Sequence, residues 1–214
     1  MALEQQDLSR MLEVAVAAAR LAGRRAMKEL NHVKVSLKSA DELVTQADAC
    51  CQKIIMDRIK EDYPDHGFIA EEGDGGKMFK QAPRGQEPIW WVIDPIDGTN
   101  NFAHGMLFFA VSIGVMCESE PIVGVIFEPA TQCMFTAVKG GEAQLNGRRI
   151  NTGEEAIGRF ARVGLESHFD DGVPGWTCEL MQRTRFRNLG STALQLVYVA
   201  KGGMVATIAG TPKL

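Results

Sequence analysis

The apolar run IWWVI at residues 89–93, which stops abruptly at Asp94, limits the possible folds more than any other feature of this sequence. A continuous apolar run of this length is typical of a strand covered on both faces, as in α/β proteins. A second apolar run, at residues 68–70, stops just as abruptly at two glutamates. Open α/β sheets place their ligand sites where strands end. We therefore predict an α/β fold in which one pocket contains Glu71, Glu72, Asp94 and Asp97.

Three segments have helical periodicity. Apolar or small residues recur every three or four positions between residues 8 and 22, which predicts an amphipathic helix that reaches about Glu29. The same spacing over residues 47–59 predicts a second helix that Tyr63 and Pro64 end. Residues 193–200 predict a third helix, closed by the glycines that follow it.

Strand patterns fill much of the remaining chain. Residues 33–37 alternate like a half-buried strand, residues 108–138 predict an antiparallel meander of three strands, and residues 161–165 predict another strand. Asn146-Gly147 marks a hairpin turn. Residues 73–87, rich in Gly, Pro and charge, predict an exposed, mobile loop. No internal repeat divides the sequence, so we expect one continuous fold over residues 1–214.

The composition excludes several classes of protein. With 45% hydrophobic and 23% charged residues, neither a disordered chain nor a disulfide-framed mini-protein is expected. The net charge of −4 argues against a broad nucleic-acid surface. Arg183, Arg185 and Arg187 are either a local basic patch or, as we prefer, the solvated face of a strand. Five cysteines without a CxxC pair, no signal-peptide pattern and no segment of roughly 18 apolar residues predict a cytoplasmic protein outside the membrane.

The acids at the strand ends predict a metal site. Carboxylates gathered in one pocket repel each other unless cations neutralise them, and oxygen ligands without His or Cys favour Mg²⁺. A Glu-Glu pair or an isolated Asp near a Gly would alone be interpreted as a turn. In DPIDGT at residues 94–99, a rigid proline and a permissive glycine fix the backbone around two acids, which favours function. Residues 97–100 also predict the start of a helix, whose N–H groups would attract a phosphate.

Several segments resemble the inositol monophosphatase family: WVIDPIDGTNNF, IAEE, LVTQAD, KGGEAQLNGRRI and RNLGSTALQLVYVAKGG. With the meander, they extend the resemblance over essentially the whole chain. The resemblance implies a layered αβαβα sandwich of the sugar-phosphatase type, an α/β (α+β) fold with mixed, largely antiparallel sheets. Residues 1–150 would form its metal-binding part and residues 151–214 the start of a C-terminal α/β part.

The resemblance also implies roles for individual residues. One Mg²⁺ would be bound by Glu71, Asp94 and the carbonyl of Ile96, a second would be shared by Asp94 and Asp97, and a third, weakly held ion would rely on Glu71 and water. Thr99 and Asp48, with Glu71, would orient and activate a metal-bound water. Substrate-binding positions would be Gly98, Thr99, Lys38, Thr192 and Glu72. The segment Gly190-Ser191-Thr192 resembles the family segment that touches the non-phosphate part of the substrate, and its alternative interpretation is an ordinary helix cap. Glu166-Ser167-His168 follows a strand at a position that borders the substrate in relatives.

The implied reaction is hydrolysis of a small polyol or sugar phosphate, such as inositol 1-phosphate, by in-line attack of water, with inhibition by lithium. No Ser, Cys or His stands in a nucleophile pair, so we predict no covalent intermediate. The histidines are interpreted as surface or structural residues. In animal members an acid shortly before a Trp-Asp pair contacts inositol, whereas residues 207–211 contain no acid. Histidinol phosphate or another small phosphate ester is therefore an alternative substrate.

Family members continue beyond the position of Leu214 with that Trp-Asp pair, whose Asp binds the second metal, so we interpret the chain as a fragment rather than a natural truncation with a weakened second site. The resemblance further implies a homodimer, with the meander as interface, although a sheet core explains its apolar residues equally well. A rival function is a regulator that binds RNA polymerase or ribosomal RNA complexes through the three arginines. A bisphosphate nucleotidase or fructose bisphosphatase relative is disfavoured by the short loop between Asp41 and Asp48.

Overall fold

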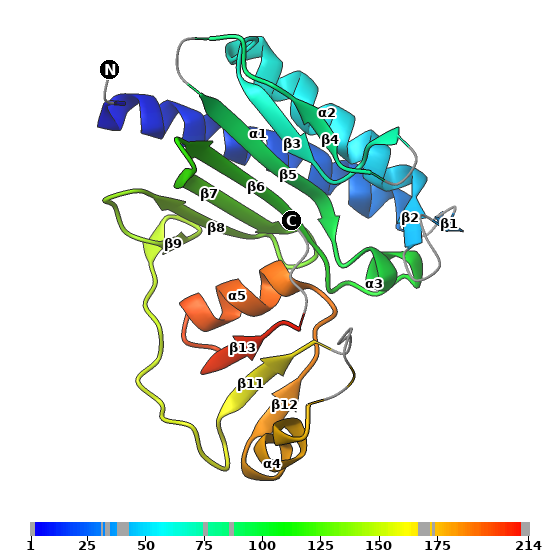
Figure 1. Cartoon of the computed structure of the whole chain (residues 1–214), viewed down its shortest axis with the longest axis vertical. Coiled ribbons are helices and arrows are strands. Elements are labelled where there is room, and N and C mark those ends of the chain that lie inside the picture. The colour runs from blue at the N-terminus through cyan, green and yellow to red at the C-terminus, as the bar shows by residue number, and fades with distance from the viewer. Residues whose placement is uncertain are drawn as a thin grey trace.

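The computed structural model describes residues 3–30, 32, 35–37, 43–74, 77–85, 88–166, 172 and 174–210. These residues form stacked layers, which Figure 1 shows in order: a pair of helices, an eight-stranded sheet, one helix, a three-stranded sheet and a last helix. This is the layered αβαβα arrangement that the resemblance implied, and the predicted fold class is confirmed.

The outer helices are α1 (Gln5–Glu29) and α2 (Gln46–Asp62), which lie side by side on one face of the large sheet. The stripe of small residues predicted for α1 is its buried face. Gly23 belongs to that face because a methyl group there would lie 2.6 Å from the ring of Phe127 in the sheet. The glycine thus lets the helix approach the sheet closely. A short hairpin, β1 (Val35–Leu37) and β2 (Leu43–Thr45), leads into α2.

The large sheet has the strand order β10-β9-β8-β7-β6-β5-β3-β4. Its strands are β3 (Gly67–Ala70), β4 (Phe79–Gln81), β5 (Ile89–Asp97), β6 (Ala110–Cys117), β7 (Glu120–Glu128), β8 (Cys133–Val138), β9 (Gln144–Leu145) and β10 (Arg148–Arg149). Only β3 and β5 pair in parallel, while all other neighbours are antiparallel. The predicted meander is therefore correct. So is the hairpin at Asn146 and Gly147, which have the positive φ values of 50° and 78° that a tight hairpin turn favours.

Helix α5 (Thr192–Ala200) covers the opposite face of the large sheet. It packs against β6 and β7 in a second apolar core that contains Ala110, Phe135, Leu194 and Val197. Beyond it lies the small sheet, in which β12 (Arg185–Arg187) and β13 (Ala206–Ile208) both pair in parallel with β11 (Arg162–Leu165). Helix α4 (Trp176–Arg183) lies farthest from the large sheet (Figure 1).

Three details differ from the sequence predictions. Strand β5 does not stop at Asp94 but continues to Asp97, with an irregular register between the two acids. It is also not fully buried on both faces, since Trp90 and Val92 are half-buried, because α5 packs on β6 and β7. The supposed loop at 73–87 contains β4, which pairs with β3 at the sheet edge.

The arginine stripe is divided between two elements. Arg185 and Arg187 are exposed on β12, as predicted for a solvated strand face, whereas Arg183 ends α4 and pairs with Glu179 at 2.9 Å. Among the described residues, no helix is long and apolar enough to cross a membrane. No disulfide joins the five cysteines, all of which are described.

Candidate functional site

The parallel pairing of β3 and β5 brings the first two predicted acids together. Ala70 pairs with Ile93, and the N–H of Glu71 donates to the carbonyl of Ile93 at 3.1 Å. Because the two strands run in the same direction, Glu71 and Asp94 emerge at the same edge of the sheet. The adjacent Glu72 is fixed by α2: its backbone N–H donates to Gln52 Oε1 at 2.9 Å, and its carbonyl accepts from Gln52 Nε2.

The backbone between Asp94 and Asp97 turns within strand β5. Asp94 Oδ1 accepts a hydrogen bond from the N–H of Ile96 at 3.1 Å, so the first acid organises the turn itself. Ladder pairing resumes at Asp97, which pairs with Ala110. The irregular stretch thus places both aspartates and the carbonyl of Ile96 at the C-terminal end of β5.

Asp48 and Thr99 meet at the start of α2, although they are far apart in sequence. Thr45 caps this helix, and Asp48 accepts hydrogen bonds from both the N–H and the hydroxyl of Thr45. The Thr99 hydroxyl lies 3.2 Å from Asp48 Oδ1 and 3.0 Å from the carbonyl oxygen of Ile96. One hydroxyl proton can serve only one of these acceptors at a time. Asp48 therefore has a structural role in the capping box of α2 as well as a place in the candidate site.

Asp97 is held by the first turn of α5. Its Oδ2 accepts from the hydroxyl of Ser191 and from the N–H of Ala193, the latter at 2.7 Å. Ser191 is buried, and its oxygen also caps α5 by accepting from the N–H of Leu194 at 3.2 Å. The metal-ligand candidate on the large sheet is thus tied to the helix between the two sheets.

Gly98 is the point at which three segments come together before the short helix α3 (Thr99–Ala103). Its φ is +99°, and a Cβ there would lie 3.0 Å from the carbonyl oxygens of both Phe108 and Gly190. Asn101 ties the same segments: its Nδ2 lies 2.7 Å from the carbonyl of Phe108 and 2.6 Å from that of Leu189. Only glycine combines this conformation with this proximity.

The carboxylates strongly affect each other's protonation. Burial, followed by the charges of Glu71 and Asp97, raises the pKa of Asp94 well above its usual value. Burial also raises the pKa of Asp97, but the hydroxyl of Ser191 and the N–H of Ala193 oppose the shift. For Asp48 burial is again the largest cause of a raised pKa, and the charge of Glu71 adds to it. Desolvation and mutual repulsion are the effects that a bound cation reverses.

The residues fit a hard cation by their chemistry. All the donors are oxygens, from Glu71, Asp94, Asp97 and the carbonyl of Ile96, which is the set that Mg²⁺ prefers. Among the residues described, no three His, Cys, Asp or Glu side chains are already arranged as a metal cluster. A cation bound here would share the Asp97 carboxylate with the hydroxyl of Ser191 and the N–H of Ala193.

The structure describes some of the remaining predicted positions but not all of them. Thr192 opens α5, and its hydroxyl donates to Glu166 Oε1 from the end of β11. Lys38, Ser167 and His168 lie outside the described residues, so their predicted places are untested. Sequence reasoning missed Gln52 and Asn101. Gln52 had a usable signal, because a polar residue four positions after Asp48 lies on the same helix face, whereas nothing local marked Asn101.

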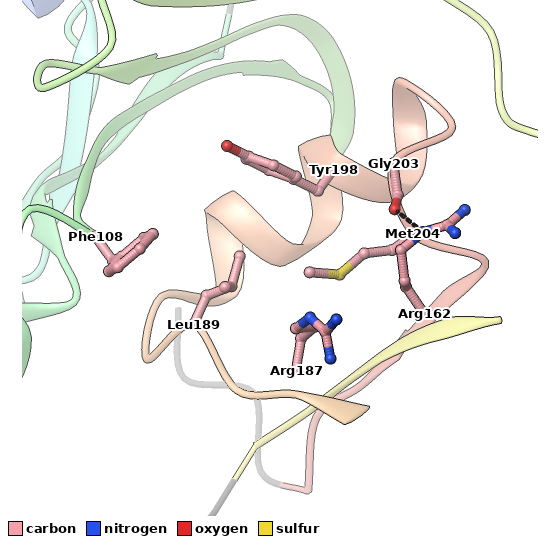
Figure 2. A pocket seen from close by; sticks show the side chains of 7 residues that line it. All are labelled: Phe108, Arg162, Arg187, Leu189, Tyr198, Gly203 and Met204. Atoms are coloured by element: carbon pink, nitrogen blue, oxygen red, sulfur yellow. Dashed lines mark hydrogen bonds between the residues drawn. The ribbon is translucent and has the colours of Figure 1, made fainter. Parts of the chain in front are cut away.

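The cavity that Figure 2 shows is separate from the carboxylates. It has a volume of about 210 Å³ and lies between α5, the small sheet and the segment before β6. Its lining consists of Phe108, Arg162, Arg187, Leu189, Tyr198, Gly203 and Met204. Arg162 Nε donates to the carbonyl of Gly203 across 2.7 Å. None of the predicted site residues lines this cavity. The candidate site is therefore assigned from the carboxylates at the strand ends and not from the position of the cavity.

Known proteins resemble the chain throughout this fold. The family model described as "Inositol monophosphatase family" matches residues 7–213. The inositol-1-monophosphatase of Rhizobium meliloti (strain 1021) is 36% identical over 203 residues, which cover 91% of this chain and 74% of that protein. The Nus factor SuhB of Escherichia coli (strain K12) is 34% identical over 201 residues, 90% of this chain and 73% of that protein.

Solved structures agree with these matches. The extragenic suppressor protein SuhB from Bartonella henselae has a TM-score of 0.81 at 30% identity, covering 91% of this chain and 76% of that chain. The IMPase of Thermotoga maritima has the same TM-score at 32% identity, covering 91% of this chain and 74% of that chain. With a family match over nearly its whole length and relatives above 30% identity, the chain belongs to the inositol monophosphatase family, a family of phosphatases.

Proposed function

We propose that this protein is a Mg²⁺-dependent phosphomonoesterase that hydrolyses a small polyol or sugar phosphate, such as inositol 1-phosphate, by in-line attack of water. Family membership supports phosphate-ester hydrolysis. The observation that carries the finer proposal is the meeting of Glu71, Asp94 and Asp97 at the ends of two neighbouring strands, beside the contact between Thr99 and Asp48.

The chain's own residues have distinct tasks in this proposal. Mg²⁺ held by Glu71, Asp94, Asp97 and the Ile96 carbonyl would supply charge neutralisation for the phosphoryl group and lower the pKa of water. The Thr99 hydroxyl donates its proton to Asp48 or to Ile96, so its oxygen can accept a hydrogen bond from water. The raised pKa of Asp48, caused mainly by burial, makes its carboxylate a better proton acceptor.

The phosphate would be held at the turn before α3. There the N–H groups of Gly98 and Thr99 belong to the first positions of a helix, which lack intrahelical acceptors. Lys38 would add a positive charge, and Thr192 and Glu72 would border the substrate. The water positioned by Thr99 would attack in line, opposite the departing alcohol, without a covalent intermediate.

The test measures phosphate release from inositol 1-phosphate with Mg²⁺, with EDTA, and with Mg²⁺ plus Li⁺. Release is expected only with Mg²⁺ and is expected to be inhibited by Li⁺. Asp94→Asn should lower kcat/KM by more than about 100-fold, since it removes a carboxylate ligand of the Mg²⁺ that would neutralise the transition-state charge. Asp57→Asn is the control, because Asp57 is exposed on α2 and forms an ion pair with Lys53 at 2.5 Å on the solvent side of the helix.

A second readout does not depend on turnover. In EDTA, Asp94→Asn is expected to unfold at a higher temperature than the wild type, because it removes a buried charge that Glu71 and Asp97 repel. With Mg²⁺ the order should reverse, since only the wild type gains stability from the ion. An unchanged rate in Asp94→Asn, or full activity in EDTA, would contradict the proposal.

The alternative substrate and the alternative function have their own tests. Histidinol phosphate in the same assay decides between a polyol and an amino-alcohol ester. A regulatory role that involves RNA polymerase or ribosomal RNA complexes is the second candidate, because relatives at 34% identity are named Nus factor SuhB. Capture of those complexes that survives Asp97→Asn, while phosphatase activity is lost, would favour it. The proposed homodimer is checked by analytical ultracentrifugation.

A further inference from the structure

The cavity beside α5 is built from side chains that the proposed reaction does not use. Its volume is about 210 Å³, and an apolar cavity of about 150 Å³ in another protein already holds benzene. A ring that carries a short side chain would therefore fit. Because none of the acids at the ends of β3 and β5 lines the cavity, a ligand here would lie outside the carboxylate site.

Most of the lining is apolar. Figure 2 shows the ring of Phe108 and the thioether of Met204 pointing toward each other across the cavity, and Leu189 belongs to the same lining. Tyr198 contributes its ring, because its hydroxyl is hydrogen-bonded to the carboxylate of Glu128. Aromatic rings and methionine sulfur both make favourable contacts with a further ring. The interior of the cavity therefore suits an aromatic group.

Two arginines supply the charged part of the lining, and one of them already has a carboxylate partner. Arg162 donates through Nε to the carbonyl of Gly203 at 2.7 Å and forms an ion pair with Glu155 at 2.6 Å. Arg187 is exposed, and within the described part of the chain its side chain bonds the carbonyl of Phe186, at 2.7 Å, and no carboxylate. A guanidinium has five N–H donors, so Arg187 retains donors for an anion.

The charges around the cavity favour an anion over a cation. Lys201 covers the ring of Tyr198, with Nζ 3.6 Å from the ring centroid, and adds a second positive charge near Arg187. Among the described residues that line the cavity there is no Asp or Glu. A ligand with an ammonium group would therefore meet like charges, whereas a carboxylate would meet opposite ones.

We propose that this cavity is a second binding site, which takes a small aromatic carboxylate. The ring of the ligand lies among Phe108, Tyr198 and Met204, and its carboxylate binds the guanidinium of Arg187. The site is distinct from the phosphatase site, and binding to it does not depend on Mg²⁺ or on phosphate-ester hydrolysis.

The test uses phenylacetate as the probe and follows the backbone amide signals of isotope-labelled protein by NMR, in EDTA. The amides of Leu189, Gly203 and Met204 are expected to shift along one saturating curve, with a Kd of about 1 mM for a ligand of this size. Acetate, which lacks the ring, and 2-phenylethanol, which lacks the charge, should each bind at least about 10-fold more weakly. 2-Phenylethylammonium, which has the opposite charge, should bind more weakly than 2-phenylethanol.

Three variants locate the site. Arg187→Met removes the guanidinium and keeps an apolar side chain, so it should weaken phenylacetate about 10- to 100-fold and leave 2-phenylethanol unchanged. Arg185→Met is the matched control, because Arg185 is exposed on the same strand but does not line the cavity, and it should bind phenylacetate as the wild type does. Phe108→Ala removes a ring and no charge, so it should weaken both ring ligands alike, by about 10-fold.

Several results would overturn the proposal. Equal weakening of phenylacetate by Arg185→Met and Arg187→Met would show attraction to the basic surface of β12 and no specific site. The absence of saturable shifts up to about 20 mM phenylacetate, or equal affinities for phenylacetate and 2-phenylethylammonium, would also contradict it. Each readout is binding without turnover, so a protein that hydrolyses no phosphate ester can still bind phenylacetate, and failure of either proposal leaves the other intact.

Discussion

Gly98→Ala tests whether the junction at the start of α3 is as tight as the structure indicates. The new methyl group would lie 3.0 Å from the carbonyl oxygens of Phe108 and Gly190 and 3.3 Å from Ser191 Cβ. These neighbours are mostly backbone, which cannot rotate away as a flexible side chain can. Gly105 provides a matched control two residues beyond α3, because it also has a positive φ, +71°, but a Cβ there meets nothing within 4 Å.

Both substitutions force an alanine into a left-handed conformation, but only Gly98→Ala also pushes a methyl group into packed atoms. A left-handed conformation costs an alanine about 1–2 kcal/mol, partly offset by the lower entropy of its unfolded chain. Gly105→Ala should therefore lower the free energy of unfolding by about 1 kcal/mol or less. Gly98→Ala adds the cost of displacing packed atoms, about 1–3 kcal/mol, for a total of roughly 2–4 kcal/mol.

For a chain of this size, about 1 kcal/mol corresponds to roughly 2–4 °C in Tm. Differential scanning calorimetry should thus show a decrease of roughly 4–16 °C for Gly98→Ala and less than about 4 °C for Gly105→Ala. Because Gly98 and Thr99 would hold the phosphate, a shift of this turn should also reduce kcat/KM by about 100-fold. Equal Tm decreases in the two variants would refute the reasoning, since they would show that the carbonyls of Phe108 and Gly190 do not crowd position 98.

Three further predictions concern other parts of the fold. Ser191→Ala removes the cap of α5 and the hydroxyl that holds Asp97, so it should lower the free energy of unfolding by about 1–2 kcal/mol in urea and weaken activation by Mg²⁺. Ser191→Thr should restore both. A loss of stability with unchanged activation by Mg²⁺ would show that Ser191 does not position Asp97. Burial lowers the pKa of His66, whose Nδ1 accepts from Trp91 Nε1 at 3.0 Å, so the folded state binds a proton less readily than the unfolded state and stability falls as the pH drops below 6.5. His66→Phe, which keeps a ring stacked on Tyr63, should flatten the decline of Tm between about pH 7.5 and 5, and an unchanged decline would contradict this. Thr207→Val should preserve stability or raise it by up to about 1 kcal/mol, because Thr207 Oγ1 is buried without a hydrogen-bond partner among the described residues; a clear loss in urea denaturation would reveal a partner.

The sequence alone determined the local elements and which acids lie at the ends of strands. The periodic stripes of α1 and α2, the meander of β6 to β8 and the hairpin at Asn146-Gly147 could all be predicted, because each depends on neighbours within a few residues. The meeting of Glu71 and Asp94 at the ends of β3 and β5 could also be predicted, since both apolar runs end in carboxylates and parallel strands end on the same side of a sheet. Strand β4 and the half-buried face of β5 could not be predicted, because edge pairing and incomplete coverage depend on which element packs against them.

Tertiary structure decided how the site is assembled. Asp97 and Ser191 are 94 positions apart, and no local pattern links them. Their contact exists because α5 packs between the two sheets with its first turn facing the end of β5. The same packing places Thr192 between Asp97 and Glu166, and it makes Gly98 rather than another glycine the crowded one. Local propensity determines what each segment becomes, whereas the close packing of layers determines which distant side chains meet, and a single sequence does not record that packing.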